Sequence, residues 1–291
     1  MIDLPVSTII LTYNEEKNIK ACLDSVIDFT DEIFVVDSGS TDSTLALLEK
    51  YSVKVIHHPF ENYSKQRNWA FENLPLKYEW ILNMDADHRL TPEFKTDINC
   101  LFSDGLPEQI NGVLSSRKTI FMGKWIKYGG HYPTYHATLF RKGFGKCEEK
   151  LYDQHFKVEG EVIKIKGDVI DLITDSLSTF TTRHDKWSNL EALEQFESIH
   201  IANNTIKGSL RANNPIAKRR YFKNIYQSFP LFVRPLLYFF IRYFLRLGFL
   251  DGKRGLIFHF LQCFWFRFLI DAKIYELKKK EVERLKFEIK I

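Results

Sequence analysis

The sequence predicts an α/β protein, a Rossmann-like mixed sheet flanked by helices and followed by a C-terminal amphipathic helical region. Three observations lead to this class. Apolar runs rich in Val and Ile alternate with amphipathic stretches over the first hundred residues, as in a parallel sheet covered by helices. Polar alternation broken by glycines follows at about 105–175, which indicates a mixed or antiparallel extension of the sheet. The last quarter of the chain is rich in Phe and Arg.

The first hundred residues alternate regularly between the two kinds of element. The strands are short, apolar and β-branched, as expected where both faces of a strand are buried. The helices place apolar residues at helical spacing. The predicted strands cover residues 6–12, 32–37, 53–57 and 79–84, and the predicted helices cover about 14–27, a segment with Leu45, Leu47 and Leu48, and 64–74.

The next part of the chain completes the sheet and then becomes helical. We expect strands at 113–121, 134–141 and 158–173, and helical structure over 186–228. The predicted domains are a sheet domain at 1–185 (halves 1–100 and 101–185), a helical segment at 186–229 and a C-terminal region at 230–291.

The C-terminal region has two Phe-rich segments, 231–250 and 256–270. A membrane span needs roughly 20 apolar residues with few charges, and these segments are too charged or too short. Arg242 and Arg246 share one helical face, so an amphipathic helix in the membrane interface fits better. The turn expected at 248–255 would place basic residues beside anionic lipid. The alternative is a Phe-rich hairpin packed on the sheet domain or on a second subunit.

Charge and cysteine content exclude several classes of protein. A net charge of +4, without a concentrated basic face, argues against nucleic acid as a partner. The four cysteines are far apart and form no CxxC pair, so a metal–thiolate or disulfide framework is not expected. The N-terminus lacks the basic and apolar regions of a signal peptide, which predicts a location on the cytoplasmic side of the membrane.

Acidic residues follow three of the predicted strands. Glu15 comes after the first strand, Asp37 ends the second, and Asp85 and Asp87 follow the fourth. Ligands bind at the carboxyl ends of the strands in parallel α/β sheets. Carboxylates clustered there repel one another, so we expect a metal ion or a hydrogen-bonding ligand among them.

The Asp85-Ala86-Asp87 triplet is the strongest candidate for a metal site. Two carboxylates one residue apart can both turn towards one Mg²⁺ or Mn²⁺, cations that prefer oxygen ligands and phosphates. The cation would stabilise a diphosphate leaving group. The alternative is a capping turn, because a helix is expected to start near Pro92.

Four other residues are candidates for nucleotide binding. Asp37 can accept a hydrogen bond from the imide of a uracil ring, and Glu15 can hold ribose hydroxyls. Arg67 has the planar fork that suits a bidentate contact with phosphates, although a solvated basic face is the alternative. Asn14 is either a ligand contact or a helix N-cap.

The motifs TYNEE, VVDSGSTD, YSKQRNWA and LNMDAD, in this order, resemble the family 2 glycosyltransferases with the GT-A fold. The branch they resemble most adds sugars during bacterial lipopolysaccharide core and surface-glycan assembly, and its members have a similar Phe/Arg-rich tail. The resemblance implies a UDP-sugar or related nucleotide-sugar donor and a divalent metal, Mn²⁺ or Mg²⁺, as cofactor. It further implies that the following residues contact the nucleotide sugar: Thr12, Asn14, Glu15, Asp37, Arg67 and Asp85. Asp87, with Asp85, would ligate the metal.

The resemblance also implies a catalytic base in a later loop. Asp153 occupies the place where relatives carry an acidic pair, and an inverting transfer needs one carboxylate to take the proton of the acceptor hydroxyl. Glu148, Glu149 and His155 are rivals within a few residues. His184 is either a contact to the leaving diphosphate or a core residue.

The function expected from these residues is transfer of a sugar to a lipid-linked or lipopolysaccharide acceptor at the cytoplasmic face of the inner membrane. A single-sugar transferase is favoured, because the Gln-x-x-Arg-Trp motif of processive relatives is absent. A metal-dependent nucleotidyltransferase is a second hypothesis, but the first loop lacks the glycines of a phosphate loop. An inactive membrane-bound scaffold is a third, although the carboxylates are all retained. A homo-oligomer remains open.

Overall fold

The computed structural model describes residues 4–174, 176–196, 207–211 and 214–289. The chain forms two compact units. The N-terminal unit holds most of the sheet and consists of residues 1–120, 133–149 and 154–172. The C-terminal unit is mainly helical and consists of residues 121–132, 150–153 and 173–291. The predicted domain boundaries at 185 and 229 stay predictions.

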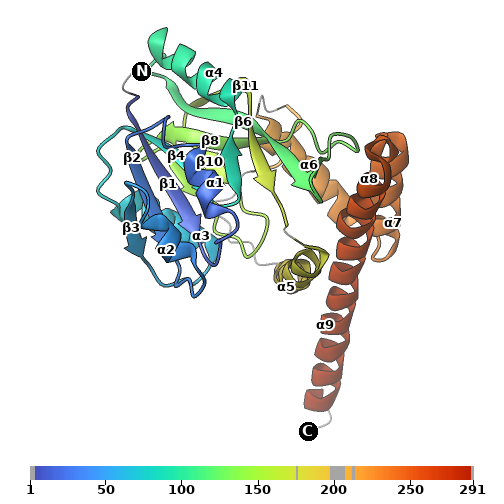
Figure 1. The fold of residues 1–291 in the computed structure, drawn as a ribbon. Helices are drawn as coiled ribbons and strands as arrows, with labels where there is room; N and C mark the ends of the chain where they lie inside the picture. Colours follow the sequence, from blue (N-terminus) through green and yellow to red (C-terminus); the bar gives the residue numbers. More distant parts are fainter. Residues whose placement is uncertain (1–3, 175, 197–206, 212–213, 290–291) are drawn as a thin grey trace. The chain divides into compact units, whose positions relative to one another are not determined.

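The N-terminal unit is built on a mixed sheet with the order β3-β2-β1-β4-β8-β6-β11-β5 (Figure 1). The four strands from β3 to β4 pair in parallel, whereas β8 is antiparallel to both β4 and β6. This confirms the predicted parallel sheet with a mixed extension. The strands are β1 (Val6–Thr12), β2 (Glu32–Asp37), β3 (Lys54–His57), β4 (Trp80–Asp85), β5 (His88–Leu90), β6 (Ile110–Phe121), β8 (Tyr135–Arg141) and β11 (Glu161–Leu172). The short strands are β7 (Lys124–Trp125), β9 (Gly145–Cys147) and β10 (Phe156–Val158).

The helices of the N-terminal unit are α1 (Ile19–Asp24), α2 (Thr44–Leu48), α3 (Tyr63–Asn73) and α4 (Pro92–Ser103). Side-chain caps set two of their starts. Asn62 accepts from the backbone N–H of Lys65 at 2.9 Å, and Thr91 accepts from Phe94 at 3.2 Å. The first helix is shorter than the predicted 14–27. Asn14 has φ +54° and is bonded to a neighbouring loop, so the helix begins only at Ile19.

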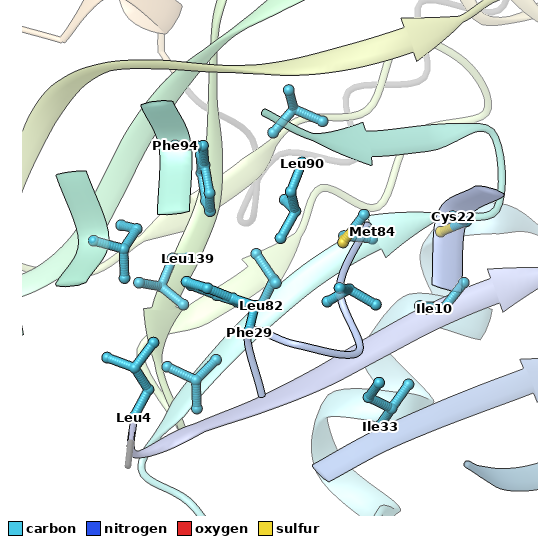
Figure 2. Packing of buried hydrophobic residues seen from close by; sticks show 14 of the residues in the cluster. Leu4, Ile10, Cys22, Phe29, Ile33, Leu82, Met84, Leu90, Phe94 and Leu139 are labelled. Carbon is cyan, nitrogen blue, oxygen red and sulfur yellow. The ribbon is translucent and has the colours of Figure 1, made fainter. Parts of the chain in front are cut away.

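The core of this unit consists of the apolar side chains of the central strands and of the helices that cover them (Figure 2). Leu82 and Met84 of β4 are fully buried, and so are Ile10 of β1 and Phe94 of α4. The close approach of α4 to β11 requires a glycine at Gly167, because a Cβ there would lie 2.3 Å from the Cα of Phe94. Burial on both faces explains the continuous apolar runs of the central strands.

The C-terminal unit consists of helices interrupted by two π-helical turns. Its elements are α5 (Leu177–Phe196), α6 (Pro215–Ser228), α7 (Val233–Phe240), η1 (Ile241–Leu245), η2 (Gly248–Asp251), α8 (Gly252–His259), η3 (Phe260–Trp265) and α9 (Phe266–Ile289). The predicted helical stretch 186–228 is thus two helices, and its residues 197–206 and 212–213 lie outside the described part. The turn predicted at 248–255 is shorter, since α8 begins at Gly252 and continues through η3 into α9.

Two apolar clusters hold the C-terminal unit together. One joins Phe121, Phe180 and Phe258, and the other joins Ala192 of α5 to Phe266, Ile270 and Ile274 of the last helix. His184 belongs to this core: its ring stacks on Phe180 at 3.7 Å, and Nδ1 lies 2.8 Å from the Phe180 carbonyl. Of its two predicted roles, the structure therefore shows the core role.

One helical stretch among the described residues, Gly248–Arg284, contains an 18-residue window whose length and composition would allow it to cross a membrane. Its mean hydropathy is 1.3, and 39% of the window is buried within the protein. The packing of Phe266 and Ile270 against α5 gives the same stretch a role as a core helix.

Candidate active site

The sheet brings the predicted strand-end residues together. In the register of the parallel strands, Thr12 pairs with Asp37 and Leu11 pairs with Asp85. Asp37 and Asp85 therefore flank the end of β1 at one edge of the sheet. This confirms that the acids of the second and fourth strands converge, as expected for the carboxyl ends of parallel strands.

The side chain of Arg67 in α3 fixes the position of Asp85. The guanidinium is fully buried, and its Nη2 donates to the carbonyl of Met84 at 2.6 Å and to Asp85 Oδ1. The Tyr63 hydroxyl adds a bond to Asp85 Oδ2 at 3.2 Å. Burial alone would raise the pKa of Asp85, but the charges around it, that of Arg67 above all, lower its pKa to about 2. Asp85 is therefore a fixed anion at neutral pH.

The burial of Arg67 bears on its predicted contact with the nucleotide. The side chain has no exposed surface, and its hydrogen bonds run to the end of β4 and to Tyr63. In this structure Arg67 affects the site through Asp85, whose position it determines. A direct contact with the nucleotide stays a prediction.

Asp87 and His88 complete a group of three with Asp85. One ligand atom from each lies within 4.8 Å of the others, which is compact enough to hold a metal ion. The backbone N–H of Asp85 donates to Nδ1 of His88 at 3.1 Å. Burial, aided by Arg117, lowers the pKa of His88 to about 4, so the ring is neutral at pH 7 and its proton is on Nε2. Nε2 lies 3.7 Å from Asp85 and 3.9 Å from Asp87, beyond hydrogen-bond distance of either carboxylate.

These residues fit a divalent cation. Asp85 and Asp87 supply hard oxygen ligands, while the protonated Nε2 of His88 leaves this ring as an orienting group. The hydroxyl of Thr12 at the end of β1 is buried without a hydrogen-bond partner in the described part of the chain. A buried donor of this kind costs free energy unless a ligand satisfies it. The triplet does not cap the next helix, since Thr91 does, but Ala86 and Asp87 do form a turn between β4 and β5.

Asp37 shapes the loop that follows β2. Its Oδ2 accepts from the backbone N–H groups of Gly39 at 2.8 Å and Ser40 at 3.0 Å, and the Ser40 hydroxyl donates to Oδ1. A carboxylate has about four lone-pair sites, so capacity for a further donor remains. The predicted contact of Asp37 with a nucleotide base stays a prediction.

Asn14 and Glu15 tie the loop after β1 to the loop after β2. Asn14 Oδ1 accepts from the backbone N–H of Thr41 at 2.7 Å, and the backbone N–H of Glu15 donates to Thr44 Oγ1 at 2.8 Å. Asn14 is not a helix N-cap, because that position belongs to Asn18. The Asn14 side chain and the Glu15 backbone thus hold together the two loops that border the strand ends, and the contacts of both residues with a nucleotide sugar stay predictions.

Asp153, the predicted base, lies in the C-terminal unit. Its backbone has φ +56°, a conformation that is uncommon outside glycine and is often found at functional sites. Its Oδ2 lies 2.9 Å from Lys223 Nζ and 3.4 Å from Arg220 Nη1, and 36% of its side chain is exposed. The catalytic role of Asp153 stays a prediction.

The rivals of Asp153 belong to the N-terminal unit. Glu148 is fully buried and accepts from the backbone N–H of His155 at 2.9 Å, so an acceptor hydroxyl has no access to it. Glu149 is exposed and forms an ion pair with Lys146 at 3.3 Å. Among these residues, Asp153 combines an exposed carboxylate with an unusual backbone conformation.

Three residues near the metal candidates were missed by the sequence analysis. They are His88, Tyr63 and Arg117, which orient or polarise Asp85. Two of them carried a usable signal, because His88 directly follows Asp87 and Tyr63 lies one helical turn before Arg67. Arg117 is distant in sequence, and only the sheet brings it to the site.

Comparison with known proteins identifies the class. The family described as glycosyl transferase family 2 matches residues 7–158, more than half of the chain, and this part contains the sheet edge and its carboxylates. The chain therefore belongs to glycosyl transferase family 2.

Particular relatives include the lipopolysaccharide core biosynthesis glycosyltransferase LpsC of Rhizobium meliloti. It is 29% identical over 208 residues, covering 67% of this chain and 73% of LpsC. An uncharacterized glycosyltransferase of Rickettsia conorii is 40% identical over 98 residues, and this match spans 34% of each protein. The chain thus spans about a third of the length of the Rickettsia relatives that it matches.

Solved structures also resemble this chain. The crystal structure of Staphylococcus aureus TarS in complex with UDP-GlcNAc has a TM-score of 0.49 at 16% identity, covering 96% of this chain and 92% of TarS. The glucosyl-3-phosphoglycerate synthase of Mycobacterium tuberculosis, crystallised with Mn²⁺ and UDP, has a TM-score of 0.32 at 20% identity and covers 40% of this chain and 44% of the synthase.

Proposed function

We propose that this chain is an inverting glycosyltransferase that moves one sugar from a UDP-sugar to a lipopolysaccharide or lipid-linked acceptor. The observation that carries the proposal is the group of Asp85, Asp87 and His88 at the strand ends of a family 2 chain. The Asp85 carboxylate is fixed by the buried Arg67, and the ligand atoms of the group lie close enough to share one cation.

The donor side is built by the N-terminal unit. Asp85 and Asp87 would hold the divalent cation, Mn²⁺ or Mg²⁺, which when bound supplies positive charge to a diphosphate leaving group. His88 accepts a hydrogen bond from the backbone N–H of Asp85 through Nδ1, and its Nε2 lies near both carboxylates. Arg67 keeps Asp85 in place before the donor arrives, so the site is preorganised and little free energy is spent on ordering it.

The base proposed for the acceptor is Asp153. In an inverting transfer one carboxylate removes the proton of the acceptor hydroxyl while the oxygen attacks the anomeric carbon. Lys223 and Arg220 lie beside Asp153 Oδ2, and 36% of the Asp153 side chain is exposed, which gives an acceptor hydroxyl access to it. Substitution of Asp153 by Asn keeps the shape and removes the base, so transfer should fall while donor binding is retained.

The acceptor location is proposed from the surface of the C-terminal unit. Large apolar side chains on α7, η1, η2 and α8 are exposed, and the exposed fraction of Leu245 reaches 66%. Contiguous apolar surface of this kind marks a membrane or protein interaction site. The adjacent Lys253 and Arg254 are exposed and carry the charge that anionic lipids attract. We therefore propose that the protein lies at the cytoplasmic face of the inner membrane. The exposed apolar residues are Leu236, Leu237, Phe240, Ile241, Phe244, Leu245, Leu247, Phe249, Leu250 and Leu256.

The proposed function is tested by UDP release from a panel of UDP-sugars, with Mn²⁺, with Mg²⁺ and with chelator, in the presence of membrane extract as acceptor. Metal-dependent UDP release with one donor supports the proposal. Absence of nucleotide binding and of turnover with every donor would contradict it.

A further inference from the structure

Three arginines of the C-terminal unit, the half-buried Arg242 and Arg267 and the exposed Arg246, lack the carboxylate partners that other cations of this unit have. Arg234 binds Asp271, Lys273 binds Asp185, and Lys223 binds Asp153 and Glu191. In the described part of the chain, no carboxylate lies within 4.0 Å of the guanidinium groups of Arg242, Arg246 or Arg267. A cation that is removed from water without a partner is costly.

Arg242 lies beside the ring of Tyr238 together with Arg267, and beside Gly130 together with Arg246. The Cζ atoms of Arg242 and Arg267 lie 5.4 and 5.9 Å from the centre of the Tyr238 ring. A Cβ on Gly130 would lie 2.6 Å from Arg246 Nη1 and 3.4 Å from Arg242 Nη1. Like charges are thus held close together, although they repel one another.

Donors without partners mark the same place. Arg242 Nε is buried and has no hydrogen-bond partner within the described residues, and the same is true of the Tyr226 hydroxyl. The Tyr226 ring lies 5.4 Å from that of Tyr238. Glu191 acts on Arg267 electrostatically, but its carboxylate is already bound by Lys223 at 3.0 Å.

The backbone is also unusual here. Arg242 belongs to the π-helical turn η1, and Arg267 follows the π-helical turn η3. Such turns are rare and are frequent at functional sites. Gly129 donates its backbone N–H to the carbonyl of Arg246 at 2.9 Å. This hydrogen bond joins the loop that contains Gly129 and Gly130 to the end of η1.

We propose that Arg242, Arg246 and Arg267, with the Tyr226 hydroxyl, form a binding site for a phosphate group. A phosphate would satisfy the unpaired donors and neutralise the clustered charge, and guanidinium groups suit its oxygens. The site lies in the unit that we propose to hold the acceptor. Two sources of this phosphate follow from the proposed function, on which this step rests. They are an anionic lipid headgroup and a phosphate on the acceptor glycan.

A metal site is the competing interpretation. His131, His259 and Cys263 place ligand atoms within 4.8 Å of one another. However, burial and then the charge of Arg242 lower the pKa of His131 well below its usual value, which shows a positive potential at this place. Because a divalent cation would be repelled by the arginines, an anion is favoured.

The test uses the full chain and compares the double variant Arg242→Gln/Arg267→Gln with Lys278→Gln/Lys279→Gln. The control removes the same charge from exposed positions on α9. Binding of inorganic phosphate is measured by calorimetry against sodium chloride at equal ionic strength. We expect the first variant to weaken binding by roughly tenfold or more, as for the loss of hydrogen bonds to a charged group, and the control to bind like the wild type. Wild-type affinity in the first variant, or no phosphate binding by the wild type, would overturn the proposal.

Tyr226→Phe covers the case in which the double variant fails to fold. It removes one hydroxyl without a partner, so the protein should fold and bind phosphate several-fold more weakly. Unchanged affinity would count against the site. If the wild type binds zinc tightly and His259→Gln loses that zinc, the phosphate site is refuted and the metal site is supported.

Vesicles distinguish the sources of the phosphate. If a lipid headgroup is bound, phosphatidylglycerol vesicles should retain more protein than phosphatidylcholine vesicles, and Arg242→Gln/Arg267→Gln should reduce the difference. If the phosphate belongs to the glycan, the double variant should lose phosphate binding and leave vesicle binding unchanged. Neither measurement uses a sugar donor, so failure of the phosphate site and failure of the proposed transfer are seen separately.

Discussion

Replacement of Arg67 by Met removes the support of Asp85 while it fills a similar volume. The fully buried guanidinium donates to the Met84 carbonyl at 2.6 Å and to Asp85 Oδ1. Removal of one partner from a buried ion pair costs about 3–5 kcal/mol. Because 26% of the Asp85 side chain is exposed and water can partly replace the lost partner, we expect the lower end, about 3 kcal/mol.

Hydrogen exchange of the amides in β1 and β4 reports the free energy of opening of the N-terminal unit. The matched control is Lys65→Met on the same helix, whose ion pair with Glu61 is exposed on both sides. That change should cost no more than about 0.5 kcal/mol. The reasoning would be refuted if Arg67→Met lowers the free energy of opening by less than about 1 kcal/mol, or if the control lowers it by the same amount.

The same variant makes a prediction on pH. The pKa of Asp85 is lowered from 3.8 to about 2, so its contribution to stability is present above about pH 4 and is lost as the pH falls towards 2. The difference between wild type and Arg67→Met should therefore shrink over this range. A difference that stays constant from pH 5 to pH 2 would show that the ion pair is not its source.

Three further outcomes are expected. Burial lowers the pKa of His184 to about 4, so the unfolded chain takes up the proton at a higher pH than the folded chain does. The stability of the C-terminal unit should therefore fall as the pH drops from about 6.5 to about 4. His184→Gln should flatten this slope in acid unfolding curves. Gly167→Ala should destabilise the N-terminal unit by about 1–3 kcal/mol, since its Cβ would meet the backbone of α4, and an unchanged urea midpoint would contradict the close packing. Phe244→Glu/Leu245→Glu should reduce sedimentation with vesicles without loss of stability, and full retention of binding would argue against this surface as the membrane contact.

The strands at the centre of the sheet were predictable because burial on both faces leaves a plain pattern. The predicted strand at 6–12 matches β1, and the one at 79–84 differs from β4 by one residue. β5 was not predicted, since three residues that begin with His88 and Arg89 show no apolar period. Its partner β11 is distant in sequence, and this pairing makes it a strand.

The last part of the chain was predicted less well, for a different reason. Glycines at 248, 252 and 255 suggested a long turn, but Gly255 is packed against Asp251 inside a helix that continues to α9. Packing against α5 stabilises this helix, and periodicity within the segment does not reveal that contact. The π-helical turns that carry Arg242 and Cys263 also have no local signature in the sequence.

The candidate site was predictable in its residue types but not in the partners that hold them. Convergence of Asp37 and Asp85 followed from the rule for parallel strands. The burial of Arg67 next to Asp85 could not be predicted from the sequence. The helix that carries Arg67 is polar on most faces, so its sequence resembles that of a solvated surface helix. The interior position becomes visible only when the helix is packed on the sheet.

The central claim is that Asp87 binds the metal that makes sugar transfer possible. Its most direct test compares UDP release by wild type and Asp87→Ala with Mn²⁺ and the active donor, while circular dichroism verifies the fold. We expect metal-dependent release by the wild type, and a loss of several orders of magnitude in a folded variant. A folded Asp87→Ala protein that releases UDP at the wild-type rate would contradict the claim.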